Sequence, residues 1–463
     1  MKKFVKWWVA ALVIVSVVFS ACTTAAPAPE KSAAKPAESK PAAEKPAETK
    51  PAAKAEEAKP AAKPADTTAK PAESKPVAAK PPIKIGYISS LTGAYAALGT
   101  DMRDGFLLQL EQNGNQIAGR KIEVIVEDDE AKPDVGLTKA RKLVERDGVN
   151  MLAGVVHSGV GYAISEYVKE KKIPLYIHNA GTDDLTQRLF NPYVFRVALV
   201  NSQNSFHLAE WAYAKGARKA ALLAADFAAG YECAGGFARA FQQLGGQIVQ
   251  EIYYPMGAAD YAPFVTSFRS DIDSVYAFGG GADSIRIVRT YDEYGMKKKA
   301  TLYGPPGLTD DSVVGQQADA ALGVITGGGW SSNVNTPANK AFLEAFSKKY
   351  NRVPGYTGEY AFAGGLLLKN ALEAVSGDIE NTDAFIKAFE RAEAPNAPRG
   401  PIKFDKYHGV VSDVFVMEVK KIEGKYVPAV IDTVKQVSQF WKWNSDEYLK
   451  LSSYSDMKNK WVK

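Results

Sequence analysis

Three short polar turns in the first half of the chain carry the residue types best suited to hold a small molecule. Each turn follows an apolar, β-branched run, at residues 89–93, 157–161 and 179–182. Hydroxyl groups and backbone amides at the start of a helix bind anions, because the free N–H groups and the helix dipole supply a positive field. The turns therefore predict a small-anion pocket that needs no lysine or arginine. Its candidate residues are His157, Ser158, Ala180, Gly181 and Thr182.

The adjacent His157 and Ser158 are also the residue types of nucleophilic catalysis, which needs a base beside an activated hydroxyl. The G-x-S-x-G motif fails, however, because Val156 occupies the first glycine position. Neighbouring side chains on an extended turn usually point apart, so a base–nucleophile pair is not expected. Cys233 is more typical of a small buried residue than of a nucleophile. We predict that the chain is not an enzyme; a hydrolase would need a base close to Ser158.

No pattern in the sequence supports a metal site or a cofactor site. The four histidines share no ligand spacing, and the acidic cluster at residues 128–130 is not followed by further spaced oxygen ligands. The glycine runs at 279–281 and 327–329 lack the spacing of phosphate-binding loops. Two cysteines are too few for a zinc cluster or a disulfide scaffold. The sequence predicts no metal and no cofactor.

The start of the chain has the features of an export signal. Lysines precede an apolar run at residues 9–19, which is shorter than the roughly 20 residues of a transmembrane helix. The sequence FSAC that ends at Cys22 resembles the lipobox of bacterial lipoproteins, although that family prefers leucine where Phe19 stands. We expect a signal peptide over residues 1–21, a lipid on Cys22, and an exported protein anchored to the outer face of the cytoplasmic membrane.

Residues 22–82 consist almost wholly of alanine, proline, lysine, glutamate, serine and threonine. Such a segment cannot bury enough apolar surface to offset its ordering entropy, so we predict a disordered tether. Residues 1–82 hold 14 of the 57 Lys+Arg and 8 of the 52 Asp+Glu, which leaves the remainder with a net charge of −1. This balance gives no reason to expect a nucleic-acid partner.

From residue 83 onward, short apolar runs alternate with amphipathic stretches, as in βαβ units. One series of such units covers residues 83–178, and a second begins after residue 201. Residues 404–431 alternate apolar and polar side chains, which predicts late antiparallel strands. In open parallel sheets, ligands bind beyond the carboxyl ends of the strands, where the polar turns lie. We predict an α/β fold of two doubly wound lobes.

Several segments resemble the Leu/Ile/Val-binding type of substrate-binding proteins of ABC importers. They include IKIGYISSLTGAYAALG at 83–99, IPLYIHNAGTDDLT at 173–186 and LYGPPGLTDDS at 302–312, and the similarity runs in order to about residue 431. The resemblance implies a type I periplasmic binding fold, in which two lobes joined by three crossover segments close on a ligand. It also implies ABC permease subunits as partners. We expect a monomer.

The resemblance places the crossovers near residues 201, 326 and 400–409. The expected divisions are a first lobe over 83–201, a second lobe over 202–326, a completion of the first lobe over 327–403, and a completion of the second lobe with a C-terminal tail over 404–463. A receptor that senses its ligand for a signalling system would have the same organisation, so sensing is an alternative role to transport.

By resemblance, the carboxylate half of the family's site is retained and the ammonium half is not. Ser158 matches the hydroxyl and amide that bind the ligand carboxylate, and the turn with Ala180 and Thr182 matches the source of a carbonyl and a second hydroxyl or amide. The acidic residue of the family's GP-acid-G turn is replaced by Pro306, which offers neither charge nor N–H. Smaller residues, Leu98 and Gly280, stand where amino-acid binders place aromatic rings.

A pocket with one carboxylate-binding wall and an apolar remainder suits an aromatic acid or another organic acid. A buried ammonium group without a partner costs several kcal/mol. The turn at 179–186 together with PYVFR at 192–196 is similar to relatives associated with aromatic-acid uptake. We favour a small carboxylate ligand of this kind, with Leu, Ile or Val as the alternative. Candidate wall residues are Tyr95, Phe227, Tyr231, Trp330 and Tyr356.

Overall fold

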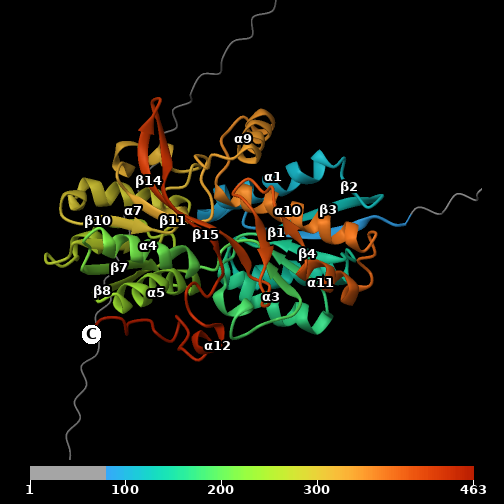
Figure 1. Cartoon of the computed structure of the whole chain (residues 1–463), viewed down its shortest axis with the longest axis horizontal. Coiled ribbons are helices and arrows are strands. Elements are labelled where there is room, and N and C mark those ends of the chain that lie inside the picture. Colours follow the sequence, from blue (N-terminus) through green and yellow to red (C-terminus); the bar gives the residue numbers. More distant parts are fainter. Residues whose placement is uncertain (1–79) are drawn as a thin grey trace, which may run out of the picture. The chain divides into compact units, whose positions relative to one another are not determined.

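The structure, a computed structural model, describes residues 80–463. The predicted signal peptide, Cys22 and nearly all of the predicted tether lie outside the described residues. Residues 80–463 form two lobes, each built on a largely parallel sheet with covering helices (Figure 1). The predicted fold class is confirmed. Every helix in this part of the chain is too short or too polar to cross a membrane.

The first lobe contains a six-stranded sheet in the order β2-β3-β1-β4-β5-β6. Neighbouring strands are parallel except β2 and β3, which form a hairpin. The strands are β1 (Ile83–Ser89), β2 (Gln116–Ile117), β3 (Arg120–Asp128), β4 (Met151–Gly154), β5 (Leu175–Ile177) and β6 (Val194–Arg196). The helices between them are α1 (Ala96–Gln112), α2 (Pro133–Glu145) and α3 (Ser158–Lys171), with short 3-10 turns η1 (Gly93–Tyr95) and η2 (Asp183–Thr186).

A nine-stranded sheet forms the second lobe and continues into the first: β8-β7-β9-β10-β11 are parallel, the late strands are antiparallel, and β12 and β13 pack on the core of the first lobe. Its strands are β7 (Lys219–Ala225), β8 (Gln247–Tyr254), β9 (Ser274–Ala277), β10 (Thr301–Gly304), β11 (Ile325–Gly328), β12 (Glu393–Ala394), β13 (Ile402–Phe404), β14 (Val410–Ile422) and β15 (Lys425–Val437). Its helices are α4 (Gln203–Ala214), α5 (Ala228–Gln243), α6 (Ala262–Thr266), α7 (Ala282–Glu293), α8 (Val314–Gln317) and α12 (Ser445–Tyr448), with η3 (Met296–Lys298), η4 (Pro306–Leu308) and η5 (Ala318–Ala321).

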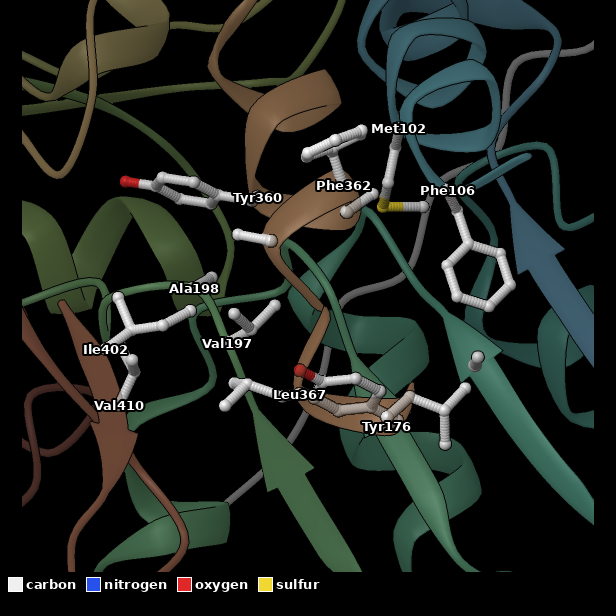
Figure 2. Close-up of a cluster of buried hydrophobic side chains, with 14 of the residues drawn as sticks. Met102, Phe106, Tyr176, Val197, Ala198, Tyr360, Phe362, Leu367, Ile402 and Val410 are labelled. Carbon is white, nitrogen blue, oxygen red and sulfur yellow. The ribbon is translucent and has the colours of Figure 1, made fainter. Parts of the chain in front are cut away.

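After β11 the chain returns to the first lobe as α9 (Pro337–Tyr350), α10 (Tyr356–Ala374) and α11 (Thr382–Glu390). Helix α10 packs along α1, although some 250 residues separate them (Figure 1). Glycines permit this approach, because a Cβ on Gly105 would lie 1.9 Å from the carbonyl oxygen of Gly358. Figure 2 shows the apolar core at this contact, with Met102 and Phe106 of α1 close to Phe362 of α10. The residues at which each lobe begins and ends stay a prediction.

The last residues, 438–463, cover helix α5 of the second lobe. The guanidinium of Arg239 on α5 lies 4.3 Å from the ring centre of Tyr454, and the rings of Tyr448 and Trp461 lie within 6 Å of it. Cation–π contacts with a partly desolvated arginine are favourable, by about 0.5–2 kcal/mol each. The aromatic residues of this segment therefore bind it to the second lobe.

Candidate functional site

A cavity with an empty volume of about 580 Å³, including its mouth, lies where the carboxyl ends of the two sheets face each other. Its walls are the loops after β1, β4 and β5 on one side and after β7, β9 and β10 on the other. This is the strand edge at which open parallel sheets bind ligands. The predicted site residues that line it are Tyr95, Leu98, His157, Ser158, Gly181, Phe227, Gly280, Pro306 and Tyr356.

One wall of the cavity is polar and is built around the N-terminus of α3. Asn201, in the segment between the lobes, donates through Nδ2 to Ser158 Oγ over 3.1 Å. Within residues 80–463 no protein group accepts the proton of the Ser158 hydroxyl, which is left to a ligand. The amides of Val160 and Gly161 bond to the His157 carbonyl, but those of Ser158 and Gly159, at the start of α3, have no partner among residues 80–463, and the His157 side chain does not cap them. A hydroxyl proton and unpaired amides thus converge where an acceptor such as a carboxylate can bind.

A second wall of the cavity is aromatic and draws on both lobes. The imidazole of His157 stacks on the ring of Phe227, with centroids 4.5 Å apart and an interplanar angle of 14°. Tyr95 lies 6.0 Å from His157 and 6.5 Å from Phe227, and Phe278 meets Phe227 edge-on at 5.7 Å. Offset and edge-on ring contacts of this kind are favourable beyond the apolar area they bury. The wall is apolar, and its rings, inclined to one another by 14° to 71°, offer faces and edges to a further planar ring.

The cavity carries no full charge. The part of the chain that the structure describes places no aspartate, glutamate, lysine or arginine among the lining residues. Burial without a compensating partner lowers the pKa of His157 to about 4, so its imidazole is neutral at pH 7. An anion must therefore be bound by dipoles and hydroxyl groups, and an ammonium group finds no carboxylate with which to pair.

The two lobes are closed around this cavity. Gly280 and Gly281, after β9, lie against η1 of the first lobe. A Cβ on Gly280 would be 3.4 Å from side-chain atoms of Leu98 and Tyr95, and one on Gly281 would be 2.3 Å from the carbonyl oxygen of Ala94. Glycine at these positions lets the lobes approach each other at backbone distance.

Two predicted residues of the turn after β5 do not line the cavity. Ala180 is buried behind it, with its amide donating to the carbonyl of Val155 over 2.9 Å. Thr182 is held by the buried Arg196, which donates to the threonine carbonyl over 2.7 Å and to its hydroxyl over 3.0 Å. The arginine takes up the groups that the turn was expected to offer to a ligand.

Two predicted wall residues also lie elsewhere. The hydroxyl of Tyr231 bonds to Asp226, and Lys458 of the C-terminal segment lies 4.9 Å from its ring centre, at the protein surface. Trp330 is buried and donates through Nε1 to Asn339 over 2.8 Å, within the core of the first lobe. Both rings are occupied by contacts within the protein.

Several lining residues were not predicted from the sequence, chief among them Asn201 and Asn204. Asn204 donates to the carbonyl of Val200 over 3.1 Å, and its Oδ1 has no partner among residues 80–463. A signal was available, because a crossover was expected near residue 201 and polar residues in a crossover border the cleft. The other missed residues are Val156, Asn179, Leu199, Ala229, Cys233, Phe278, Gly279, Pro305, Gly307 and Tyr360.

Comparison with known proteins identifies the family. The family described as "Periplasmic binding protein" matches residues 82–425. A Leu/Ile/Val-binding protein homolog of Brucella melitensis is 26% identical over 362 residues, covering 76% of this chain and 92% of the relative.

Two solved structures share the fold over nearly their whole length. An ABC transporter substrate-binding protein from Sphaerobacter thermophilus is 33% identical with a TM-score of 0.73, over 77% of this chain and 98% of that one. A solute-binding protein of an ABC transporter from Rhodopseudomonas palustris, in complex with 3,4-dihydroxybenzoic acid, is 30% identical with a TM-score of 0.73, over the same shares. The chain therefore belongs to the type I periplasmic binding proteins, the substrate-binding proteins that serve ABC transporters.

Proposed function

We propose that this protein captures a small aromatic carboxylate between its lobes and delivers it to an ABC permease. The observation that carries the proposal is the uncharged cavity, which combines the Ser158 hydroxyl and the α3 amides on one wall with the ring of Phe227 on the other. A carboxylate receives hydrogen bonds and the field of the helix N-terminus, while a planar ring lies among aromatic side chains.

The same cavity argues against a free amino acid as the preferred ligand. An α-ammonium group would be buried without a counter-charge, at a cost of several kcal/mol. Pro306 occupies the position from which an acidic side chain could reach it, and it lines the cavity. The alternative ligands Leu, Ile and Val are supported by the names of relatives such as the Brucella protein.

Related evidence supports the choice of an aromatic acid. The Rhodopseudomonas palustris relative binds 3,4-dihydroxybenzoic acid. In the present chain, Oδ1 of Asn204 is an acceptor without a partner among the described residues, and it could receive a ring hydroxyl of such a ligand. We therefore place hydroxylated benzoic acids first among the carboxylates to be tested.

We further propose that the protein works at the outer face of the cytoplasmic membrane, held by a lipid on Cys22 and acting as a monomer. The sequence of residues 1–82 supports this proposal. Mass spectrometry of the mature N-terminus tests it: an unmodified terminus downstream of Cys22 contradicts the anchor. The competing role is that of a receptor that reports its ligand to a signalling system instead of to a permease. Uptake assays in a strain lacking the protein distinguish the two roles.

A thermal-shift panel tests the proposed function. Benzoate and 3,4-dihydroxybenzoate should raise the melting temperature, whereas leucine and the uncharged analogue benzamide should not. A ligand at 100 times its Kd adds about 2.7 kcal/mol to the free energy of unfolding, which is easily measured. A large shift with leucine and none with the benzoates would contradict the proposal.

Replacing Ser158 with alanine should weaken binding of 3,4-dihydroxybenzoate by about 1–3 kcal/mol, the usual range for a hydrogen bond to a charged group. Calorimetric titration measures the change. Ser267→Ala is the matched control, because that exposed hydroxyl bonds only to the nearby carbonyl of Phe264, over 2.7 Å. Equal affinity of the two variants would remove Ser158 from the site.

A further inference from the structure

A buried glutamate links the two lobes directly behind the polar wall. Glu232 of α5, in the second lobe, is only 3% exposed. Its Oε1 accepts a hydrogen bond from the hydroxyl of Tyr162 on α3 over 2.6 Å, and its Oε2 accepts from Asn201 Nδ2 over 2.6 Å. The same Asn201 nitrogen donates to Ser158 Oγ over 3.1 Å. A continuous chain of short contacts thus runs from α3 of the first lobe to α5 and back to Ser158.

The partners of this carboxyl group are unusual for a buried acid. Within the described part of the chain, no lysine or arginine forms an ion pair with Glu232, and both donors lie outside the second lobe. A buried carboxyl group that loses its hydrogen bonds pays a desolvation cost of several kcal/mol if it stays buried. The arrangement around Glu232 is therefore complete only while the lobes are closed.

Other polar groups fix the first-lobe side of the contact. The Tyr162 hydroxyl also accepts the amide of Asp184 over 3.2 Å, so the ring is held from η2 as well. The neighbouring Asp183 accepts hydrogen bonds from Ser202 in the crossover segment. The remaining ionisable groups around Glu232 are the Asp184 carboxyl on η2, Cys233 on α5 and Arg196 on β6.

The charges near Glu232 are mostly negative. Burial, followed by the charge of Asp183, raises the pKa of Glu232 well above its usual value, and burial raises the pKa of Asp183 to about 6. Closure therefore shifts the acid toward its protonated form relative to an exposed glutamate. In an open molecule, where water reaches the carboxyl group, the pKa returns toward its ordinary value.

We propose that Tyr162, Glu232 and Asn201 form a cross-lobe latch that holds the closed state together and positions the Ser158 hydroxyl for the bound carboxylate. Tyr162 and Glu232 are positioning residues, since neither lines the cavity. The proposal rests on the proposed function for the identity of the ligand, but not for the contact between the lobes. Closure of the lobes and positioning of the Ser158 hydroxyl for the carboxylate therefore occur together.

Binding of 3,4-dihydroxybenzoate to variants tests the latch. Tyr162→Phe removes one hydrogen bond that exists only in the closed state, so we expect affinity to fall about tenfold. Tyr167→Phe is the control, because Tyr167 lies on the same helix and bonds to Glu145 within the first lobe, over 3.1 Å. The latch is overturned if both variants bind as the wild type does.

The pH dependence separates a latch from a merely structural contact. Closure takes up a proton at Glu232 when the pH lies between its open and closed pKa values. Affinity of the wild type should therefore fall as pH rises through that interval, by up to tenfold per pH unit. Glu232→Gln mimics the protonated acid and should show near-normal affinity at low pH with a flatter profile. An unchanged profile in Glu232→Gln contradicts the latch.

A measurement of lobe separation keeps the latch distinct from the ligand assignment. Spin labels at Glu170→Cys of the first lobe and Asp292→Cys of the second report the distance between two exposed positions. Without ligand, Tyr162→Phe should shift the distance distribution toward longer values, and Tyr167→Phe should not. If the wild type fails to bind 3,4-dihydroxybenzoate but this shift is seen, the ligand proposal fails and the latch stands. If the distributions coincide, the latch fails.

Discussion

Gly281→Ala should lower the affinity for 3,4-dihydroxybenzoate by at least about 100-fold, which corresponds to about 2.8 kcal/mol. The added Cβ would lie 2.3 Å from the carbonyl oxygen of Ala94, across the cleft. Both atoms belong to the backbone or are fixed to it, so no side-chain rotation relieves the overlap. The lobes must instead stay apart, and the ligand loses its contacts with one of them.

Backbone strain alone cannot mimic this result. Gly281 has φ 55° and ψ −128°, a conformation that suits glycine and costs other residues about 1–3 kcal/mol. That strain is present in the open and closed states alike, so it lowers the melting temperature without weakening binding. Gly295→Ala is the control: Gly295 has φ +70° in the same lobe, and no atom lies within 4 Å of the added Cβ.

Calorimetric titration of the wild type and both variants distinguishes the clash between the lobes from backbone strain. Gly295→Ala should bind 3,4-dihydroxybenzoate with wild-type affinity despite a lower melting temperature. Gly281→Ala should bind weakly, and a pair of spin labels on the lobes should remain at its open distance when the ligand is added. Wild-type affinity in Gly281→Ala would mean that the closed arrangement around Ala94 is not the ligand-bound one.

The fold could be read from the sequence because parallel α/β lobes leave a strong local signal. Most buried strands of the parallel sheets are short apolar runs, as in IKIGYIS and KAALLAA, and most are followed by a helix. The late strands β14 and β15 are antiparallel as predicted, although most of β14 is buried on both faces instead of alternating. These signals depend on neighbouring residues in the chain, which a single sequence contains.

The site could be predicted only as far as it depends on strand ends. Ser158 begins α3 directly after β4, so its place at the sheet edge follows from the local sequence. Thr182 has an equally suitable local sequence, yet Arg196, fourteen residues later, takes its carbonyl and hydroxyl. Such competition between a ligand and a distant side chain is a property of the folded chain.

Contacts between the lobes were the least predictable part. The local sequence predicts only that Glu232 is a polar residue in a helix. No nearby residue indicates that its partner is Tyr162, seventy residues earlier. The position of Asn201 between Ser158 and Glu232 also depends on how the lobes close. A periodic pattern indicates that a residue is buried, but it does not say which lobe supplies its hydrogen-bond donors.

Pro306→Glu should abolish the preference for aromatic carboxylates by placing a negative charge in a cavity that has none. Pro306 begins η4 and lines the cavity, so an acidic side chain there would share the space with the ligand carboxylate. At a separation of about 6 Å and an effective dielectric constant of about 20, two such charges repel by about 3 kcal/mol, or about 100-fold in affinity.

Pro306→Gln is the matched control for Pro306→Glu, because glutamine has the same shape without the charge. We expect Pro306→Gln to retain most of the affinity for 3,4-dihydroxybenzoate, and Pro306→Glu to recover it partly as the pH falls and the new acid is protonated. Titration calorimetry at two pH values measures both effects.

The new carboxylate also supplies the partner that an ammonium group lacks in the natural cavity, so leucine should bind Pro306→Glu better than it binds the wild type. Equal affinity of the two variants for the benzoate at neutral pH would show that charge in this cavity does not select the ligand, and the argument from its neutrality would fail.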